Sequence, residues 1–314
     1  MKKIVFLDEY SIAGCDMSSV KSQGDYVAYE NTRKEDVVER LKGADIAITN
    51  KVLIDGETMR QLPDLKLICV AATGMNNVDL NAAAELGIEV RNAVGYSTTS
   101  VAETTLASAL ALARNIVYFD QYFHDGRYAA ADRAFCYDRT TSEIRGKRWG
   151  IVGLGNIGRE VARLATAFGC EVAYFSTSGV KREEGYPSME LNELLQWSDI
   201  VSVHSPLNER TRGLIGSNEL KLMKPTSFII NVARGGIIDE TALAEALNNG
   251  VIAAAALDVF SVEPLRESAL YDVKDRYRLL ASPHNAWSAV EAIDRLIECV
   301  VENIRVWRAK QQNS

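Results

Sequence analysis

The strongest constraint on the fold of this chain is the segment at 149–169, which reads WGIVGLGNIGREVARLATAFG. An apolar run enters a glycine-rich turn, GLGNIG at 153–158, and the turn leads directly into apolar residues at helical spacing. A strand, a tight turn and a helix in this order make up the first half of a parallel βα unit. The segment therefore predicts a sheet whose strands are joined by helices.

Short apolar runs alternate with helical patterns on both sides of this turn. Strands are expected at 4–8, 25–30, 45–49, 65–71, 88–92, 149–153, 171–176, 199–204, 227–233, 254–259 and 277–283. A long helical segment at about 99–119 lies between the two series, and a last helix is expected at 286–310. Such alternation is typical of α/β proteins. We predict two Rossmann-like, doubly wound parallel-sheet domains with a cleft between them: residues 1–98 completed by 286–314, and residues 99–285.

The composition agrees with this layout and excludes several classes of partner. The 314 residues are enough for about two domains, and 47% of them are hydrophobic. A net charge of −7 argues against nucleic acid or an anionic membrane as partner. The short apolar run near the N-terminus is interrupted by Asp8 and Glu9, which does not fit a signal peptide. We expect a cytoplasmic protein, with its five scattered cysteines reduced.

The glycine-rich turn is where a dinucleotide is expected to bind. Gly153 permits the tight turn, Gly155 lets the backbone approach a pyrophosphate, and Gly158 permits close packing of helix on strand. The pyrophosphate would lie at the helix N-terminus, where unpaired N–H groups point outward. The alternative is a plain tight turn, because GxGxxG by itself is a weak signal.

The end of the following strand favours NADP(H) over NAD(H). NAD sites usually place a carboxylate there to bind the ribose hydroxyls. This chain has Ser176, Thr177 and Ser178 instead, with Lys181 close behind. Hydroxyl groups and a cation suit a 2′-phosphate better than a bare ribose. The alternative is that Lys181 is a solvated loop charge.

Three further blocks follow strands of the second series: NVARGGIIDE at 231–240, LDVFSVEP at 257–264 and SPHNAW at 282–287. The carboxyl ends of parallel strands line the crevice where ligands bind. We therefore expect Arg234, Glu263 and His284 to converge on one site. Each residue taken alone also has an ordinary structural explanation, as an ion-pair partner, a turn carboxylate or a packed histidine.

Taken together, these blocks give the chain a clear family resemblance. They occur in order with VAATGMNNVDL at 70–80, GYSTTSVAETTLA at 95–107 and HSPLNERTRGLIG at 204–216. The chain resembles the D-isomer-specific 2-hydroxyacid dehydrogenases over nearly its whole length. Within that family it looks most similar to the glycerate dehydrogenases and hydroxypyruvate/glyoxylate reductases.

The resemblance implies roles for particular residues. It makes Arg234 the ligand of the substrate carbonyl and carboxylate, and Glu263 the partner of a catalytic His284. It implies that residues 1–98 form the substrate domain and 99–285 the cofactor domain. The remaining residues implied to contact the cofactor are Asn156, Ile157, His204, Pro206, Thr211, Val232, Ala233, Asp258 and Thr104, with Asp258 near the nicotinamide carboxamide. Those implied to contact the substrate are Thr73, Gly74, Met75 and Asn76. Lys51, which follows the expected strand at 45–49, and Trp287, at the start of the last helix, are further candidates from their positions.

The expected chemistry suits these residue types. Arginine is a planar, bidentate cation that matches a 2-oxo acid. Histidine can protonate the developing alkoxide near neutral pH, and an adjacent carboxylate favours the imidazolium. No metal is required. The resemblance also implies a homodimer formed through the long helical segment. The alternative for Lys51 is a solvated loop lysine. The alternative for Trp287 is a packing residue at the start of the last helix.

The substrate stays open among several small 2-oxo acids. Hydroxypyruvate or glyoxylate is favoured, with D-lactate dehydrogenase or another 2-hydroxyacid dehydrogenase as the alternative. The chain ends at Ser314, which leaves no room for the regulatory domain of many phosphoglycerate dehydrogenases. A different class of function is a cofactor-sensing binding protein like the corepressor members of the family, which keep the same three residues.

Overall fold

The computed structural model describes residues 1–12, 14–180 and 185–312. The chain folds into two compact units. Unit 1 comprises Met1–Ser97 and Ser288–Ser314, and unit 2 comprises Thr98–Trp287. The C-terminal helix therefore belongs to the same unit as the N-terminal strands, although nearly two hundred residues separate them in the sequence.

Unit 1 is built on a five-stranded parallel sheet with the strand order β2-β1-β3-β4-β5. Its strands are β1 Lys3–Phe6, β2 Asp25–Ala28, β3 Ile46–Thr49, β4 Leu67–Val70 and β5 Glu89–Asn92. Its helices are η1 Glu9–Ile12, α1 Ser18–Lys21, η2 Lys34–Asp36, α2 Val37–Leu41, α3 Gly56–Arg60, α4 Leu80–Glu85 and α11 Val290–Gln312.

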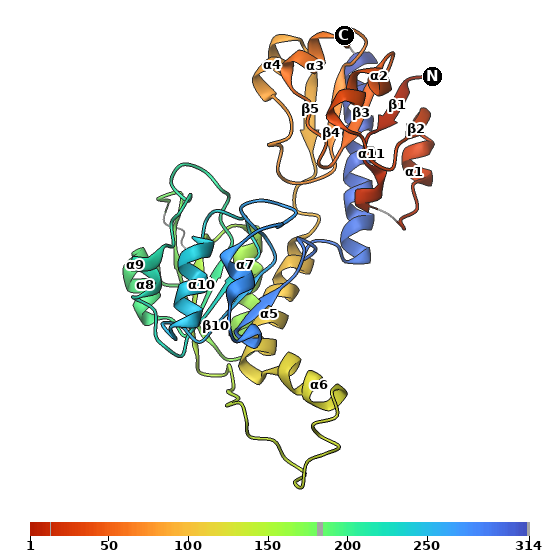
Figure 1. Cartoon of the computed structure of the whole chain (residues 1–314). Coiled ribbons are helices and arrows are strands. Elements are labelled where there is room, and N and C mark those ends of the chain that lie inside the picture. The colour runs from red at the N-terminus through yellow and green to blue at the C-terminus, as the bar shows by residue number, and fades with distance from the viewer. Residues whose placement is uncertain (13, 181–184, 313–314) are drawn as a thin grey trace. The chain divides into compact units, whose positions relative to one another are not determined.

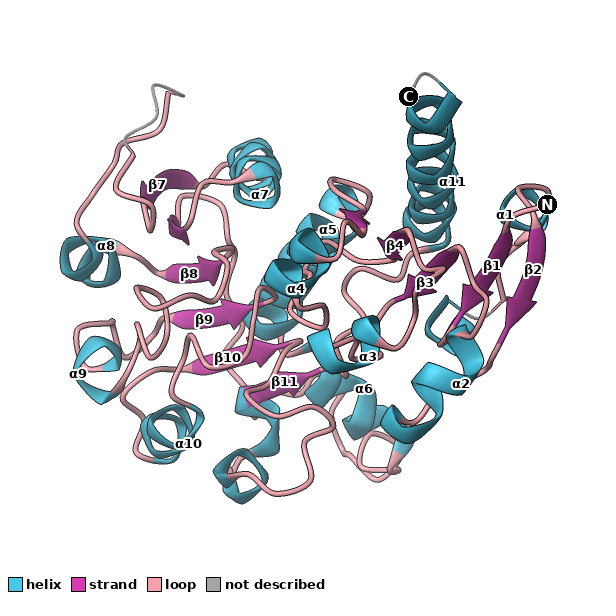
Figure 2. Cartoon of the chain, turned by 90° about the horizontal axis from the view of Figure 1, so that it is seen from above, coloured by secondary structure: helices cyan, strands magenta, loops and turns pink. Residues whose placement is uncertain are grey.

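Helices cover both faces of this sheet. On one face α2, α3 and α4 share a core with the strands, to which each helix contributes buried residues such as Leu41, Met59 and Ala82. On the other face lies α11, beside α1 (Figure 2). The central strands β3 and β4 are buried along their whole length, as the strands of a parallel sheet covered on both sides are.

Unit 2 is built on a six-stranded parallel sheet with the order β11-β10-β9-β8-β6-β7. Its strands are β6 Arg148–Val152, β7 Glu171–Phe175, β8 Ile200–Val203, β9 Phe228–Asn231, β10 Ala254–Leu257 and β11 Leu279–Ala281. Its helices are α5 Thr98–Arg114, α6 Ile116–His124, α7 Asn156–Ala167, α8 Leu191–Trp197, α9 Ser217–Leu220, α10 Glu240–Asn248, η3 Ala269–Asp272 and η4 Arg276–Arg278.

The strand order of unit 2 places a ligand crevice at β6. From β6 the chain passes to β7 on one side and then to β8 on the other, so β6 lies at the point where the strand order reverses. In doubly wound sheets ligands bind outside the carboxyl ends of the strands at this point. Helices α5 and α7 pack on one face of the sheet, and α8, α9 and α10 cover the other (Figure 2).

The long helical segment of unit 2 contains a break. Asn115 has a φ of 50°, so α5 ends before it and α6 begins after it. Asparagine is one of the few residues that adopts this left-handed conformation readily. Its side-chain amide donates to the carbonyl oxygen of Thr140 at 2.9 Å. The prediction of one continuous helix at 99–119 is therefore wrong at this residue.

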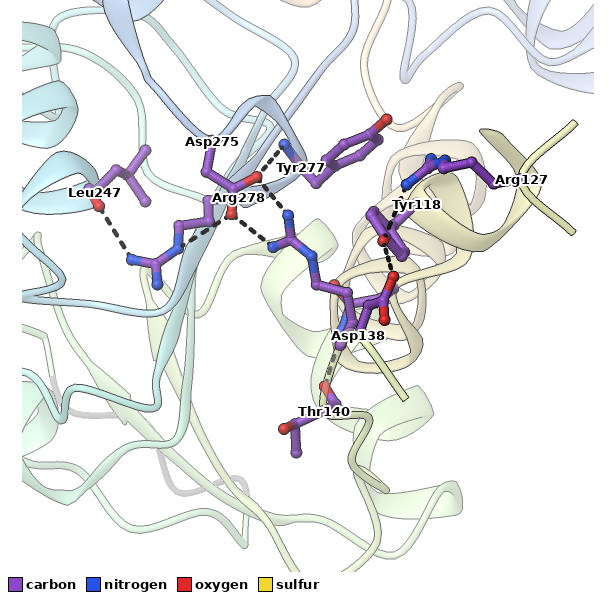
Figure 3. Close-up of polar contacts among 10 residues, drawn as sticks. Tyr118, Arg127, Asp138, Thr140, Leu247, Asp275, Tyr277 and Arg278 are labelled. Atoms are coloured by element: carbon purple, nitrogen blue, oxygen red, sulfur yellow. Dashed lines mark hydrogen bonds and ion pairs between the residues drawn. The ribbon is translucent and has the colours of Figure 1, made fainter. Parts of the chain in front are cut away.

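Helix α6 and the residues that follow it extend away from the sheet of unit 2 before the chain returns to β6 (Figure 1). We call residues 116–138 the arm. Polar contacts anchor its two ends (Figure 3). Tyr118 donates to the Asp138 carboxylate at 2.8 Å. Just beyond it, Arg139 forms a bidentate pair with Asp275 at 2.6 and 2.8 Å, and this hydrogen-bonded arginine lowers the pKa of Asp275.

The predicted fold class of two parallel-sheet α/β units is confirmed. All the expected strands form, each within about two residues of its predicted range. Gly43 and Gly87 follow α2 and α4 with positive φ, a conformation that glycine adopts readily at the ends of helices. The last helix begins at Val290, four residues later than expected. Within the described part of the chain, no helix combines the length and apolarity that crossing a membrane requires.

Candidate functional site

The glycine-rich turn after β6 has the geometry that a dinucleotide needs. Gly153 has a φ of 97°, and a Cβ there would lie 3.0 Å from the backbone nitrogen of Ser205. A Cβ on Gly158 would lie 2.3 Å from the Gly153 carbonyl oxygen, so α7 packs directly on the turn. Gly155, the N-cap of α7, has open space around the same position. The backbone at Gly155 is thus accessible where a pyrophosphate would approach.

The first turn of α7 supplies donors at this place. Asn156 and Ile157 begin the helix, and their backbone N–H groups have no partner within the helix. Gly155 caps the helix without a side chain, so no side-chain oxygen occupies these N–H groups. The residues present fit the phosphates of a dinucleotide, because the N-terminus of a helix favours an anion.

The carboxyl end of β7 borders a cavity of about 310 Å³. Its lining includes Phe175, Ser176, Thr177, Gly179, Glu190 and Arg210. The Ser176 hydroxyl donates to the Val180 carbonyl oxygen at 2.7 Å and lies 3.3 Å from the Ser178 hydroxyl. The predicted cofactor residue Lys181 lies outside the described residues.

The turn after β8 is held by its own side chains. Thr211 is buried, donates to the Pro206 carbonyl oxygen at 2.6 Å and accepts from the Asn208 N–H at 2.8 Å. The Asn208 carboxamide oxygen accepts from the N–H groups of Arg210 and Thr211 at 2.9 and 3.2 Å. Thr211, predicted to contact the cofactor, therefore uses its hydroxyl to shape the turn that carries Pro206 and Arg210.

His204 is the first residue after β8, and its ring lies in a buried hydrogen-bond chain. Trp149 donates from its indole N–H to the Ser202 hydroxyl at 2.8 Å, and His204 Nε2 lies 2.9 Å from the same oxygen. Burial lowers the pKa of His204 to about 3, so the ring is neutral at physiological pH. Among the described residues, His204 Nδ1 and the Ser205 hydroxyl are the buried side-chain polar atoms that have no partner.

The turn after β9 carries Arg234. Asn231 holds this turn at both ends, because its side chain accepts from the Ala233 N–H at 3.0 Å and donates to the Arg234 carbonyl oxygen at 2.9 Å. Arg234 Nη1 donates to the Ala233 carbonyl oxygen at 2.6 Å. A Cβ on Gly235 would lie 1.9 Å from the Phe260 carbonyl carbon. The Arg234 turn therefore packs directly on the backbone of the turn that carries Glu263.

Glu263 and His284, two of the predicted catalytic residues, are in direct side-chain contact. Glu263 Oε2 lies 2.7 Å from His284 Nδ1, with side-chain exposures of 34% and 23%. The other carboxylate oxygen accepts from the Phe260 N–H at 3.0 Å. Trp287 donates from its indole N–H to the His284 carbonyl oxygen at 2.9 Å. His284 is thus oriented through Nδ1, which directs Nε2 away from the carboxylate.

Asp258 holds the turn that carries His284. Its carboxylate accepts from the Ser282 hydroxyl at 2.6 Å and from the N–H groups of Asn285 and Ala286 at 3.0 Å each. Its carbonyl oxygen accepts from the His284 N–H at 2.7 Å. His284 has a φ of 53°, which is unusual for a residue other than glycine and needs support from its surroundings. Asp258 provides that support, and its predicted contact with the nicotinamide carboxamide stays a prediction.

Helix α5, which carries the predicted cofactor residue Thr104, holds this turn from another side. Ser100 and Thr104, on α5, donate to the Ala286 carbonyl oxygen at 2.6 and 3.5 Å. Thr104 also donates to the Ser100 carbonyl oxygen at 3.0 Å. Val232 is buried against α5 and α7. The side chains of Ser100 and Thr104 therefore help to fix the position of the His284 turn.

The predicted substrate residues of unit 1 follow β3 and β4. Asp8 is buried, and its carboxylate accepts from the N–H groups of Asn50 and Lys51 at 2.9 and 2.6 Å. Burial is the main cause that raises the pKa of this carboxyl. The Thr73 hydroxyl donates to the Ala93 carbonyl oxygen at 3.1 Å.

The loop after β4 carries the other predicted residues of this group: Gly74, Met75 and Asn76. Met75 packs against the core of unit 1. Since β3 and β4 are parallel neighbours, the loops that follow them lie at the same edge of the sheet. The backbone of both predicted substrate loops is thus shaped by unit 1 itself.

A family model matches residues 106–286, which include every element described here for unit 2 except the start of α5. Its description is D-isomer specific 2-hydroxyacid dehydrogenase, NAD binding domain. The chain belongs to this family. It is therefore an oxidoreductase, and the family resemblance predicted from the motifs is confirmed.

Full-length relatives of this dehydrogenase carry more specific names. The chain is 38% identical to a glycerate dehydrogenase of Methylorubrum extorquens, over 99% of this chain and 98% of that protein. It is 33% identical to a hydroxypyruvate reductase of Blautia hydrogenotrophica, over 96% and 95%. A solved structure of an NADPH-dependent glyoxylate/hydroxypyruvate reductase from Sinorhizobium meliloti is 27% identical, with a TM-score of 0.84 over 98% of this chain and 95% of that chain.

Three residues of this dehydrogenase site were not found from the sequence. Arg210 and Glu190 line the cavity at the end of β7, although they follow other strands or loops. Glu240 accepts from the Ser261 N–H at 2.6 Å and so braces the turn of Glu263. Glu240 closes the NVARGGIIDE block, and Arg210 lies within the block HSPLNERTRGLIG at 204–216. These two positions are the available signals, because Glu190 lies in no such block.

Proposed function

We propose that this dehydrogenase reduces hydroxypyruvate or glyoxylate to the corresponding D-2-hydroxy acid and uses NADPH as its preferred cofactor. The observation that carries the proposal is the 2.7 Å pair of Glu263 and His284 on the turn after β11. This pair lies at the carboxyl edge of the sheet that also carries the glycine-rich turn. Two relatives, a glycerate dehydrogenase and a hydroxypyruvate reductase, support the choice of substrate.

The mechanism requires a proton donor and an anchor for the carboxylate. When bound, the nicotinamide cofactor supplies the hydride. His284 protonates the developing alkoxide through Nε2, while Glu263 holds Nδ1 and stabilises the charged ring. In the oxidative direction the neutral ring accepts the hydroxyl proton. Arg234 binds the carbonyl and carboxylate oxygens as a bidentate cation.

The substrate carboxylate is further bound by the backbone of the loop after β4. We assign this role to residues 73–76, whose backbone N–H groups suit a small anion. Lys51 adds a positive charge at the same edge of the unit 1 sheet, on a backbone that Asp8 fixes. Trp287 is proposed as a wall of the substrate pocket.

A panel of 2-oxo acids tests this proposal. Steady-state rates with NADPH and NADH would be measured for hydroxypyruvate, glyoxylate, pyruvate and phenylpyruvate. We expect the largest kcat/KM with hydroxypyruvate or glyoxylate. A clear preference for pyruvate would make the protein a D-lactate dehydrogenase. Tight cofactor binding without turnover of any of them would favour a cofactor-sensing binding protein.

The proposed preference for NADPH rests on the serine-rich end of β7. No carboxylate is available at Ser176, Thr177 or Ser178 to bind the ribose hydroxyls, and a hydroxyl tolerates a phosphate that a carboxylate repels. The Ser176→Asp variant should therefore shift preference toward NADH. Unchanged use of NADPH by that variant would contradict this assignment. The NADPH-dependent reductase of Sinorhizobium meliloti is a relative with this cofactor.

We also propose that the protein is a homodimer in which the arm contributes to the interface. Large apolar side chains are exposed along the arm: Ile116, Val117, Phe123, Tyr128, Phe135 and Tyr137. Phe135 and Tyr137 are 74% and 87% exposed. A group of exposed apolar side chains of this size usually marks an interaction surface. The contacts of Tyr118 and Arg139 fix both ends of the arm and so reduce the entropy lost on association.

Equilibrium sedimentation tests the dimer. The wild-type protein should be dimeric at micromolar concentration, and the double variant Phe135→Ser, Tyr137→Ser should dissociate at least tenfold more readily. Tyr10→Ser is the matched control, because Tyr10 is 69% exposed in unit 1. A monomeric wild-type protein would contradict the proposal. The cytoplasmic location and the independence from metal stay predictions from the sequence.

A further inference from the structure

The cavity at the end of β7 combines two segments that are far apart in the sequence. One is the segment directly after β7, which contributes Ser176, Thr177 and Gly179, and the other is the turn after β8, which carries Arg210. In the sheet, β6 lies between β7 and β8, so the two segments flank the strand that leads into the glycine-rich turn. The ribose of a dinucleotide bound at that turn lies beside the end of the second strand of such a unit.

Arg210 is the positively charged residue among the described residues that line this cavity. It is exposed, and no ion pair or hydrogen bond of its guanidinium occurs with any described residue. Its backbone, in contrast, is fixed, because Asn208 accepts its N–H at 2.9 Å and the buried Thr211 follows it. A cation on a rigid turn with an unused guanidinium is suited to bind an anionic ligand group.

The other lining residues include hydroxyl groups that can bind a phosphate and one carboxylate that would repel it. Thr177 and Ser176 bring hydroxyl groups, and Gly179 brings backbone without a side chain. Glu190 is the negatively charged residue among the described lining residues, and it would repel a phosphate in the same space. The balance of Arg210 against Glu190 therefore decides how strongly a 2′-phosphate is preferred over a hydroxyl.

We propose that Arg210 is a cofactor-specificity residue, whose guanidinium binds the 2′-phosphate of NADPH from the turn after β8. The inference rests on the proposed use of NADPH and adds the residue that enforces it. Arginine matches a phosphate with two parallel hydrogen bonds, and such charge-assisted bonds are stronger than those from a hydroxyl. Thr177 then completes the phosphate site from the segment that follows β7.

Calorimetric titration with adenosine 2′,5′-bisphosphate and with adenosine 5′-monophosphate tests this role on the whole protein. The two probes differ only in the 2′-phosphate. The Arg210→Ala variant should bind the bisphosphate about 10- to 100-fold more weakly, as expected for the loss of a charged hydrogen-bond pair. Binding of the monophosphate should change by less than about twofold. The ratio of kcat/KM for NADPH over NADH should fall by the same factor as the bisphosphate affinity.

Two further variants make the result specific. Arg212→Ala is the matched control, because Arg212 is exposed on the same turn and does not line the cavity. This variant should leave the affinities for both probes unchanged. Glu190→Gln removes the opposing carboxylate and should tighten binding of the bisphosphate severalfold.

The outcomes separate the inference from the proposed function. A wild-type protein that binds both probes equally would overturn the use of NADPH, and the role of Arg210 with it. A wild-type preference for the bisphosphate that survives in Arg210→Ala would overturn the role of Arg210 alone. If the Arg210→Ala variant bound both probes equally more weakly, the role would also be overturned. The residue would then act on the adenosine or on the turn itself.

Discussion

Two histidines follow strands of the same sheet, and their surroundings differ in every respect that matters for proton transfer. His284, on the turn after β11, pairs with a carboxylate through Nδ1 at 2.7 Å and is partly exposed. His204, after β8, lies beside the Ser202 hydroxyl in a buried chain that begins at Trp149. Burial lowers the pKa of His204 to about 3.

The position of a histidine at a strand end therefore does not decide its chemistry. A proton donor needs a charged form that is accessible at working pH and a partner that stabilises this form. Glu263 provides that partner for His284, whereas desolvation removes the charged form from His204. Variants of His284, Glu263, Asp258 and His204 test this contrast.

The largest effect is expected for His284→Asn. Asparagine tolerates the left-handed conformation that His284 adopts, so the variant removes the ring without adding backbone strain. Loss of a general acid typically lowers turnover by about 10²- to 10⁴-fold. Single-turnover rates measure this loss, and NADPH binding by fluorescence should persist. Turnover within tenfold of wild type would remove His284 from the mechanism.

Glu263→Gln should have the next largest effect. The amide keeps a hydrogen bond to the ring but loses the negative charge that stabilises the imidazolium. We expect kcat/KM for reduction to fall about 10- to 100-fold at neutral pH. The loss should appear mainly in kcat, because Glu263 acts through His284 and does not bind the substrate. Glu267→Gln, on an exposed residue nearby, is the control and should leave kcat unchanged.

Asp258→Asn tests whether the turn that carries His284 must be held by a full carboxylate. The amide nitrogen cannot accept from Ser282, Asn285 or Ala286, so at least one of three hydrogen bonds is lost. We expect turnover to fall about tenfold and unfolding to become easier by about 1–3 kcal/mol. Asp55→Asn, which removes a carboxylate that caps α3, should lower stability without changing turnover. Equal turnover in both variants would refute the positioning role of Asp258.

His204→Gln should have the smallest effect on turnover, within about threefold, since a neutral buried ring transfers no proton at working pH. Its main effect should be on the pH dependence of stability. The unfolded chain protonates this ring as the pH falls through about 6.5, whereas the folded protein does so only near pH 3. The stabilisation is therefore complete above about pH 6.5 and is lost as the pH falls toward 3.

Urea unfolding at several pH values measures this loss. Between pH 6 and 5 the wild-type free energy of unfolding should fall by up to about 1.4 kcal/mol per pH unit more than that of His204→Gln. His124→Gln is the control, because the ring of His124 is exposed and remote from the sheet edge. Parallel pH dependences for wild type and His204→Gln would show that the ring is not held neutral by the fold.

The sequence alone determined the layout of this protein. The strands are short apolar runs with polar or glycine-rich ends, and the glycine turn at 153–158 joins one of them to a helix. These signals are local, because strands and helices are recognised by the spacing of their apolar residues and turns by their glycines. The blocks that carry Arg234, Glu263 and His284 were predictable for the same reason, because each directly follows a strand of one parallel sheet.

Only the tertiary structure decided which groups share a hydrogen bond or a cavity. The Asp258 carboxylate accepts hydrogen bonds from residues 282–286, and Gly235 packs on the backbone of Phe260. These residues lie about 25 positions apart in the sequence, and local residue spacing does not encode such contacts. Arg210 reaches the end of β7 because the strand order places β6 between β7 and β8. The break at Asn115 likewise depends on a side-chain bond to Thr140, twenty-five residues away. Local sequence specifies the elements, whereas long-range packing chooses their partners.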